Sequence, residues 1–382
     1  MRILHICNDF CGSKVHANLY KRLDELNVEQ TIFTYYRGTG KEEKNQFEAL
    51  HTSFIYKGIL RIWHRLFYHL KIRKVYSELK KEIIPLDYDL IHATTLFSDG
   101  AIAYQLHKEF NLPYIVTVRN TDVNTFLGIA PHTWLMGLKI LRNAQRIIFI
   151  SKALQGKFCK HIAIRRILPD IQNKFVLQPN GIDDYWLNNI NRIERTISYN
   201  VIYVGRFDRN KNVVRLIKAV LNLRQLFPDL RLHLVGGGGS KERAVLRMID
   251  NHPDCLFYQG QISDKDKLKE LYRQCSIFAM PSIHETFGLV YIEALSQNLA
   301  ILYTRGQGVD GMFDRSVGEA VNPQSIKSIE NGLKKYFEQP SAYHPYNIID
   351  FDEFRWEKIA GRYKKIYEKA LVNRLNPSNE IC

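Results

Sequence analysis

The sequence has no apolar run that approaches the ~18–20 residues needed to cross a bilayer, although hydrophobic residues make up 45% of its 382 residues. Residues 1–9 do not resemble a secretory signal, because their apolar stretch is short and polar residues interrupt it. They fit a buried first strand instead. We therefore expect a globular cytoplasmic protein of two domains, whose six cysteines remain reduced thiols.

Metal-binding and cofactor motifs are also scarce. Cys7 and Cys11 lie close together, but no second pair of Cys or His follows at zinc spacing. Asp87 and Asp89 have the spacing of a carboxylate metal site, but they precede a predicted strand and so point away from the edge where parallel sheets bind ligands. Residues 236–239 are all glycine, without the lysine of a P-loop or the spacing of a dinucleotide fingerprint. We expect neither a bound metal nor a cofactor.

Positive charge, in contrast, is abundant and uneven. The formal net charge is +15, and residues 1–180 hold 26 Lys and Arg against 15 Asp and Glu. A basic first half predicts a polyanionic partner: a membrane surface, a phosphorylated substrate or nucleic acid. Because no basic and aromatic ribonucleoprotein motif accompanies the charge, we expect no nucleic-acid partner.

Short apolar runs alternate with helical patterns along the whole chain, as in parallel sheets with crossover helices. The predicted strands cover residues 3–6, 31–35, 90–93, 114–118, 146–150, 201–204, 231–235, 255–258, 276–280 and 299–303. Helical patterns lie between most of them, as at 213–226 and 265–275. The polar, aperiodic stretch 183–198 marks a boundary. The sequence thus predicts two doubly wound α/β domains, with a ligand at the carboxyl ends of the strands.

The first strong motif follows the strand at 201–204. Gly205 and Arg206 come directly after it, and Lys211 lies further along the same loop, before a helix. An arginine can bind a diphosphate bidentately and a lysine adds a point charge, so this loop suits a diphosphate. The alternative is a solvated basic turn. We expect both cations to be exposed when no ligand is bound.

The second strong motif is Met280-Pro-Ser-Ile-His-Glu285-Thr-Phe-Gly-Leu-Val-Tyr-Ile-Glu293. A helix is expected to begin around Phe287, and free N–H groups at a helix start bind phosphate. Gly288 would allow a ligand to approach closely. Glu293 falls almost two turns into the helix, which suits two carboxylates binding different parts of an extended ligand. The alternative makes Glu293 a surface residue of that helix.

Together these motifs resemble the E-x7-E segment and the diphosphate-binding signature of glycosyltransferase family four, the group 1 type of retaining enzymes with the GT-B fold. Leu234-Val-Gly-Gly-Gly-Gly239 is similar to the family's glycine turn, and residues 257–260 to the strand beside the nucleotide base. Residues 89–93, 114–122, 178–183 and 354–367 also match, so the resemblance covers most of the chain. It implies two Rossmann-like domains facing a central cleft: an acceptor-side domain at 1–182, joined by a crossing helix at about 363–382, and a nucleotide-sugar domain at 199–362.

The resemblance also implies roles for particular residues. Arg206 and Lys211 would hold the donor diphosphate and stabilise the leaving nucleotide, and Glu285 would contact the sugar; these three are the expected catalytic residues. Electrostatic stabilisation of the leaving group would dominate, because the family has no obvious enzymic nucleophile. The implied donor-binding residues are Gly12, Ser13, Gly205, Gln261, Ile262, Thr286, Phe287, Gly288, Leu289 and Glu293.

The first half departs from the family pattern in two places. The family often has a Gly-Gly pair after its first strand, where this chain has Gly12 followed by Ser13 and Lys14. Many members have a histidine where this chain has Arg119. These departures leave the acceptor-side catalytic role open between Arg119 and the nearest carboxylate, Asp122.

Residues 55–81 carry a separate pattern. Lys57, Arg61 and Arg65 recur every four residues, and an adjoining face holds Ile59, Trp63, Leu66, Phe67 and Leu70. This pattern predicts a basic amphipathic helix, which either lies on an anionic membrane surface through Lys57, Arg61, Trp63 and Arg65 or buries its apolar face in the core. The first alternative predicts a peripheral protein on the inner face of the cytoplasmic membrane.

The resemblance as a whole implies a retaining, metal-independent hexosyltransferase. Its donor would be a UDP- or GDP-linked sugar, and its acceptor a glycan or lipid-linked precursor of capsule, O-antigen or lipopolysaccharide type. Two alternatives remain open: a nucleotide-sugar epimerase on the same fold, which needs no acceptor, and a catalytically degenerate sugar-binding relative.

Overall fold

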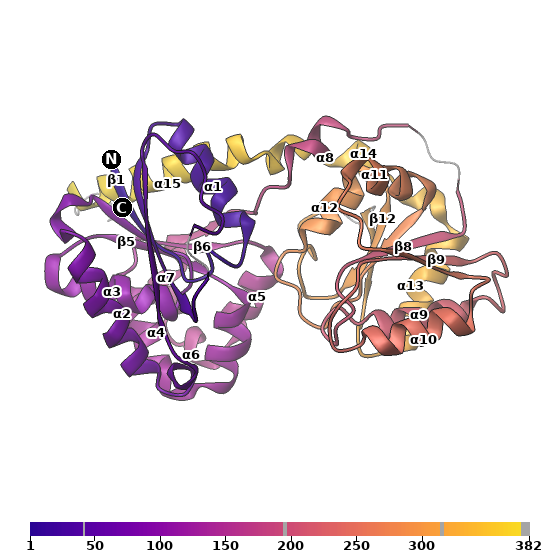
Figure 1. Cartoon of the computed structure of the whole chain (residues 1–382), viewed down its shortest axis with the longest axis horizontal. Coiled ribbons are helices and arrows are strands. Elements are labelled where there is room, and N and C mark those ends of the chain that lie inside the picture. Colours follow the sequence, from indigo (N-terminus) through magenta and orange to yellow (C-terminus); the bar gives the residue numbers. More distant parts are fainter. Residues whose placement is uncertain (41–42, 194–196, 314–316, 376–382) are drawn as a thin grey trace. The chain divides into compact units, whose positions relative to one another are not determined.

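The computed structural model describes residues 1–40, 43–193, 197–313 and 317–375, which form two compact units (Figure 1). Unit 1 comprises Met1–Ile150, Leu154–Gly181 and the chain from Trp356 onward. Unit 2 comprises Ser151–Ala153 and Ile182–Arg355. Each unit is built on one parallel sheet with helices along it, which confirms the predicted α/β class.

The sheet of unit 1 has seven strands in the order β3-β2-β1-β4-β5-β6-β7. Their bounds are β1 Arg2–Ile6, β2 Glu29–Arg37, β3 Thr52–Leu60, β4 Leu90–Ala93, β5 Tyr114–Val118, β6 Arg146–Phe149 and β7 Phe175–Leu177. The main helices are α1 Lys14–Glu25, α2 Tyr68–Glu82, α3 Ser98–Phe110, α4 Trp134–Asn143 and α5 Lys152–Lys160. The four central strands are wholly or almost wholly buried, as expected for a parallel sheet covered by helices on both faces.

The sheet of unit 2 has six strands in the order β10-β9-β8-β11-β12-β13. Their bounds are β8 Asn200–Val204, β9 Arg231–Val235, β10 Leu256–Gly260, β11 Ile277–Ala279, β12 Ala300–Thr304 and β13 Gly318–Val321. The helices between them are α9 Val213–Leu223, α10 Glu242–Asn251, α11 Lys265–Gln274, α12 Leu289–Ser296 and α13 Ile326–Glu338. The strand order reverses between β8 and β11, which places ligands at the carboxyl ends of these two strands.

The last helix, α15 (Trp356–Leu375), packs into the core of unit 1 (Figure 1). Ile359, Tyr363 and Tyr367 are buried there beside α1, and the Tyr367 hydroxyl lies 2.9 Å from Nδ1 of His92. The helix begins seven residues before the predicted position of about 363, and residues 376–382 lie outside the described residues. A long segment from the far end of the sequence thus completes the first unit.

The prediction of one basic amphipathic helix over residues 55–81 is wrong. Residues 52–60 form the edge strand β3, paired with β2, a short 3-10 turn follows at Ile62–Arg65, and α2 begins only at Tyr68. The β-branched and aromatic residues at 52–56 favour a strand. Lys57, Arg61 and Arg65 therefore lie on different elements and do not form one helical face. No helix among the described residues is both long and apolar enough to span a membrane.

Candidate donor-binding site

Three glycines allow the backbones to approach closely where the first three strands of unit 2 end. Gly205, Gly236 and Gly260 stand at or just after the carboxyl ends of β8, β9 and β10. Gly205 N–H donates to Val235 at 3.0 Å, and Gly236 N–H donates to Gly260 at 2.7 Å. A Cβ on Gly236, whose φ is +127°, would overlap the carbonyl of Gly205. This close backbone approach is the structural reason for glycine at that position.

The loop after β8 presents Arg206 to solvent. The Tyr203 hydroxyl donates to the Arg206 carbonyl at 2.7 Å, which fixes the backbone while the side chain stays exposed. Asp208 accepts from the backbone N–H of Lys211 at 2.8 Å and so shapes the turn that carries this lysine. The expectation of an exposed cation therefore holds for Arg206.

Two asparagines that sequence reasoning missed tie this loop to its neighbours. Asn210 donates to the His284 carbonyl and accepts from the His284 N–H, both at 3.0 Å. Asn212 is in the left-handed region at φ +61°, and its amide donates to Pro281 at 2.9 Å and Pro323 at 2.7 Å. Asparagine tolerates this backbone conformation, which is the local signal that could have identified Asn212.

Lys211 and Glu285 form an ion pair across the site. Lys211 Nζ lies 2.8 Å from Glu285 Oε2, although 74 residues separate them in the sequence. Their side chains are 27% and 11% exposed. Lys211 is therefore half-buried, whereas the sequence predicted that it would be exposed to solvent. The other carboxylate oxygen of Glu285 accepts from Thr286 N–H at 3.1 Å. The structure thus brings together two of the three residues expected to be catalytic.

Helix α12 begins beside this pair. It starts at Leu289, two residues later than expected, and Gly288 stands at its N-cap with φ +80°. A Cβ on Gly288 would overlap the Tyr291 ring and come within 3.2 Å of Cγ of Glu285. The described residues supply no acceptor for the N–H groups of Phe287 and Gly288. Leu289, as the first helical residue, also has an N–H outside the helical ladder. This helix end can bind an anion.

Glu293 lies in the second turn of α12, and its side chain is half-buried. Burial raises the pKa of its carboxyl to about 7, and the nearby Asp183 adds to the rise while Lys265 opposes it. No hydrogen bond to this carboxylate is formed among the described residues. A carboxylate that is partly desolvated and without a protein donor is suited to receive hydroxyl donors from a ligand.

Gln261 and Ile262 follow β10, where Gln261 is exposed and Ile262 half-buried. The Gln261 amide lies beside the glycine turn, 3.4 Å from where a Cβ on Gly237 would stand. The donor-site residues expected in the second half, Thr286 included, therefore lie on loops or at a helix start at the carboxyl edge of one sheet, except Glu293, which lies in the second turn of α12.

Gly12 and Ser13 lie at the carboxyl edge of the other sheet, after β1 of unit 1. Both donate their N–H to Asp9, at 2.9 and 3.0 Å, and a Cβ on Gly12 would overlap the Asp9 side chain. The Ser13 hydroxyl accepts from Val15 N–H at 3.4 Å as the N-cap of α1. The next residue, Lys14, is exposed. This loop has the glycine-then-helix form of a phosphate-binding turn.

Arg119 and Asp122 lie after β5 of the same sheet. Arg119 is half-buried, and its Nε donates to the Thr94 carbonyl at 3.3 Å. Asp122 is fully buried, and its carboxylate accepts three backbone N–H groups, from Leu96, Phe97 and Arg119, at 2.8–3.1 Å. Burial raises its pKa to about 6, which these hydrogen bonds oppose. The Asp122 carboxylate is buried and its oxygens already accept backbone N–H groups. Asp122 therefore positions the loop after β4 and the backbone at Arg119.

Replacing Asp122 with alanine would leave two buried N–H groups and one partly buried N–H group without this acceptor. At ~1–3 kcal/mol for each unsatisfied group, we expect Asp122→Ala to lower the free energy of unfolding by ~3 kcal/mol or more, measured by urea denaturation. Asp170→Ala is the control, because the Asp170 side chain forms an exposed ion pair with Arg142, worth ~0–1 kcal/mol. Equal losses in both variants would contradict the positioning role.

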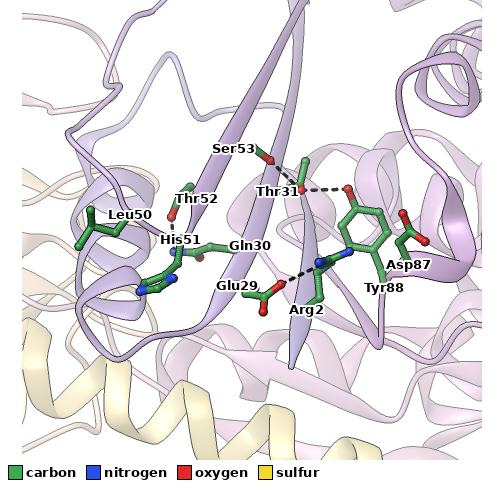
Figure 2. A pocket seen from close by; sticks show the side chains of 10 residues that line it. All are labelled: Arg2, Glu29, Gln30, Thr31, Leu50, His51, Thr52, Ser53, Asp87 and Tyr88. Carbon is green, nitrogen blue, oxygen red and sulfur yellow. Dashed lines mark hydrogen bonds and ion pairs between the residues drawn. The ribbon is translucent and has the colours of Figure 1, made fainter.

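The Asp87–Asp89 segment lies at the opposite edge of the unit 1 sheet. An open pocket of about 510 Å³ lies there. Figure 2 shows its lining, which comes from residues at the amino ends of β1, β2 and β3 together with Asp87 and Tyr88. Arg2 and Glu29 are ion-paired at 2.9 Å, and the Tyr88 hydroxyl donates to Thr31. Asp89 accepts from Arg2 N–H at 2.8 Å. In the described part of the chain, no group of three or more His, Cys, Asp and Glu is placed to hold a metal ion.

Known proteins match the chain over nearly all of its length. The family described as Glycosyltransferase Family 4 matches residues 12–185, and the family described as Glycosyl transferases group 1 matches residues 192–348. An uncharacterized glycosyltransferase of Methanocaldococcus jannaschii is 24% identical over 371 residues, which are 94% of each chain.

Solved structures show the same fold. Sucrose-phosphate synthase of Thermosynechococcus elongatus superposes with a TM-score of 0.72 at 21% identity, over 97% of this chain and 99% of that one. A pneumococcal O-GlcNAc transferase in complex with UDP and GlcNAc superposes with a TM-score of 0.66 at 14% identity, over 97% and 99%. With both family matches in the expected order, this chain belongs to the group 1, family four glycosyltransferases of the GT-B fold.

Proposed function

We propose that this protein transfers a hexosyl group, with retention of anomeric configuration and without a metal ion, from a UDP- or GDP-linked sugar. The acceptor would be a glycan or lipid-linked precursor of capsule, O-antigen or lipopolysaccharide type. Arg206, Lys211 and Glu285 would be the catalytic residues. Gly12, Ser13, Gly205, Gln261, Ile262 and residues 286–289, with Glu293, would bind the donor.

One observation carries the donor proposal. The Lys211–Glu285 ion pair stands beside a helix start whose Phe287 and Gly288 N–H groups have no acceptor among the described residues. Exposed Arg206 lies on the same loop as Lys211. Free N–H groups beside Lys211, with Arg206 on the same loop, suit a diphosphate, and the adjacent carboxylate suits sugar hydroxyls.

The chemistry that this cluster supports is stabilisation of a leaving nucleotide. As the bond from the sugar to the diphosphate breaks, negative charge grows on the phosphate oxygens. Arg206 and Lys211 would neutralise that charge, and the N–H groups at the start of α12 would bind the distal phosphate. Glu293 would accept hydrogen bonds from ribose hydroxyls. A phosphate oxygen of the donor would help to deprotonate the acceptor.

The acceptor proposal rests on charge. Residues 1–180 carry 26 Lys and Arg against 15 Asp and Glu, and Lys14 is exposed at the start of α1. Lipid-linked glycan precursors carry phosphate, which such a basic domain attracts. A neutral free glycan would gain nothing from this charge.

A panel of nucleotide sugars tests the function. Binding and slow release of nucleotide are measured for each UDP- and GDP-sugar, alone and with candidate acceptors. Nucleotide release that rises with an acceptor supports transfer, and NMR of the product's anomeric proton decides between retention and inversion. An epimerase would convert the donor without any acceptor. Failure of every nucleotide sugar to bind would overturn the proposal.

Activity should survive removal of divalent metal ions, because protein cations occupy the place of a metal at the diphosphate. We expect the turnover rate in excess EDTA to stay within about twofold of the untreated rate, since neither Arg206 nor Lys211 depends on a bound ion. Transfer assays with and without EDTA measure this. Loss of activity in EDTA that manganese or magnesium restores would contradict the mechanism.

Donor affinity should depend on the protonation of Glu293. Its pKa is about 7 in the free protein. Ribose hydroxyls donate to the ionised form and would lower that pKa on binding, so binding releases a proton below pH 7. We expect the Kd of an intact nucleotide sugar to fall as the pH rises from 5.5 to 7, by up to ~10-fold per pH unit, and to level off above pH 8.

The matched variant for this prediction is Glu293→Gln. It keeps the shape of the side chain but has no group that titrates. Its Kd should therefore be higher than that of wild type at pH 8 and nearly independent of pH. An intact nucleotide sugar has no phosphate proton that titrates near neutral pH, so the ligand adds no slope of its own. An unchanged pH profile in this variant would show that another group titrates.

A further inference from the structure

Unit 1 carries a patch of large apolar side chains that the core does not use. Ile62 and Leu66 are 81% and 80% exposed, and Trp63, Phe67 and Leu70 are also exposed. These five residues, here called the apolar patch, lie within nine positions on the 3-10 turn and the start of α2. The alternative that this apolar face is buried in the core is therefore wrong.

The exposure does not come from a poorly packed segment. Helix α2 already has a core face made of Tyr68, Ile72, Val75 and Leu79. The Tyr68 hydroxyl donates to the Phe97 carbonyl at 2.7 Å. Because one apolar stripe anchors the helix, the apolar patch forms a second face that faces away from the core.

The turn before the helix is equally ordered. His64 is buried, and its Nδ1 accepts from Arg61 N–H at 2.9 Å. The Trp63 ring stacks on His64 with centroids 3.7 Å apart, and the Phe67 ring lies 6.3 Å away. The indole is thus held at the surface with 44% of the residue exposed. Clustered exposed apolar side chains of this kind mark an interaction site.

Cations surround the apolar patch and acids are absent from its sequence. No Asp or Glu occurs from residue 49 to residue 77. Arg61 and Arg73 are exposed, line an open pocket of about 670 Å³ together with Trp63 and Leu70, and have no carboxylate partner in the described part of the chain. Lys57 and Lys74 are ion-paired with Glu82 and Glu78. The side chain of Arg65 lies outside what the structure describes.

We propose that the apolar patch, with Arg61 and Arg73, docks on an anionic phospholipid surface. Ile62, Leu66 and Phe67 would enter the acyl boundary, Trp63 would lie at headgroup depth, and the two guanidinium groups would bind headgroup phosphate. Charge complementarity favours this occupant. A second copy of the chain that docked through the same face would bring Arg61 and Arg73 against a segment that also lacks carboxylates from 49 to 77, and so would oppose like charges.

Co-sedimentation with vesicles tests the proposal. Full-length protein is mixed with phosphatidylcholine vesicles with or without phosphatidylglycerol, at low and high salt. Wild type should bind only the anionic vesicles, and more weakly at high salt because screening shortens the field. Leu66→Ser/Phe67→Ser and Arg61→Glu/Arg73→Glu should each weaken partitioning by at least ~10-fold.

Matched variants control for lost apolar surface and for net charge. Ile84→Ser/Leu86→Ser removes two exposed apolar side chains of unit 1 outside the apolar patch. Lys108→Glu/Lys160→Glu makes the same change in net charge at exposed sites elsewhere in that unit. Both control variants should bind like wild type, and thermal melts should show that all four fold.

Three results would overturn the proposal. Wild type could fail to bind anionic vesicles at low salt. The control variants could lose binding as strongly as the patch variants, which would reduce the effect to net charge. Ultracentrifugation could show a dimer that Leu66→Ser/Phe67→Ser dissociates while vesicle binding persists, which would make this face a contact between copies. Nucleotide-sugar binding is assayed in parallel, so failure here is distinguishable from failure of the proposed transfer activity.

Discussion

Arg206→Ala and Lys211→Ala should each lower the rate of sugar transfer by ~10²-fold or more, corresponding to ~3 kcal/mol of lost transition-state stabilisation. Both cations would face the diphosphate, on which charge grows as the nucleotide leaves. Since they act on the transition state, the loss should fall mainly on kcat, with a smaller change in KM. Steady-state kinetics at saturating acceptor measure both quantities.

The two variants should differ in stability. Arg206 is exposed, so its removal should leave the free energy of unfolding within ~0.5 kcal/mol of wild type. Lys211 is paired with Glu285, whose side chain is only 11% exposed, and its loss leaves that carboxylate without its cation. We expect a loss of ~1 kcal/mol, which Lys211→Ala/Glu285→Gln should largely recover without recovering transfer.

Arg209 supplies a control on the same loop. It is exposed, lies between the two proposed catalytic cations in sequence, and forms no ion pair with the described residues. Arg209→Ala should keep transfer within about threefold of wild type. If this variant falls as far as Arg206→Ala, the loop acts through its total charge, and the specific roles of Arg206 and Lys211 are wrong.

The strands that sequence analysis located share a simple physical signature. Residues 90–93, 114–118 and 201–204 are mostly apolar, with His92 and Thr117 as their polar members, because both faces of a central parallel strand are covered. The strands that it missed lie at the edges. β7 (Phe175–Leu177) is an apolar run of only three residues, too short to stand out, and β13 contains Glu319 in a four-residue strand. The sequence of β3 resembles part of a helix because the strand is half-exposed and Lys57 interrupts its apolar residues.

Most of the proposed donor residues could be located from the sequence because they lie in loops that follow predicted strands; Glu293 is the exception, in the second turn of α12. Their partners could not. Lys211 reaches a carboxylate 74 residues away, and Asn210 and Asn212 join the same distant loops. Asp122 looked like a free acid next to Arg119, and only the tertiary structure shows that three backbone N–H groups fill its carboxylate. Such bonds depend on which loops the sheet order brings together.

Gly288→Ala should be as damaging to transfer as loss of a proposed catalytic cation, although it removes no polar group. An added Cβ would overlap the Tyr291 ring. That ring cannot move aside easily, because Tyr291 is buried, packs edge-on against Phe278 at 5.4 Å, and donates its hydroxyl to Met280. The backbone at 286–289 must shift instead, and the N–H groups proposed to bind the distal phosphate shift with it. We expect kcat/KM to fall ~10²-fold, since misplacement by about 1 Å costs this much.

A matched glycine separates this steric effect from backbone strain. Gly38, in unit 1, has φ +78° against +80° for Gly288, and a Cβ there would meet nothing within 4 Å. Gly38→Ala should therefore bear the same left-handed penalty of ~1–2 kcal/mol and keep normal kcat/KM. Gly288→Ala should lose stability and also weaken nucleotide-sugar binding, measured by calorimetry on protein shown to be folded by circular dichroism. If Gly288→Ala folds and binds the donor as tightly as Gly38→Ala does, the start of α12 does not bind the donor phosphate.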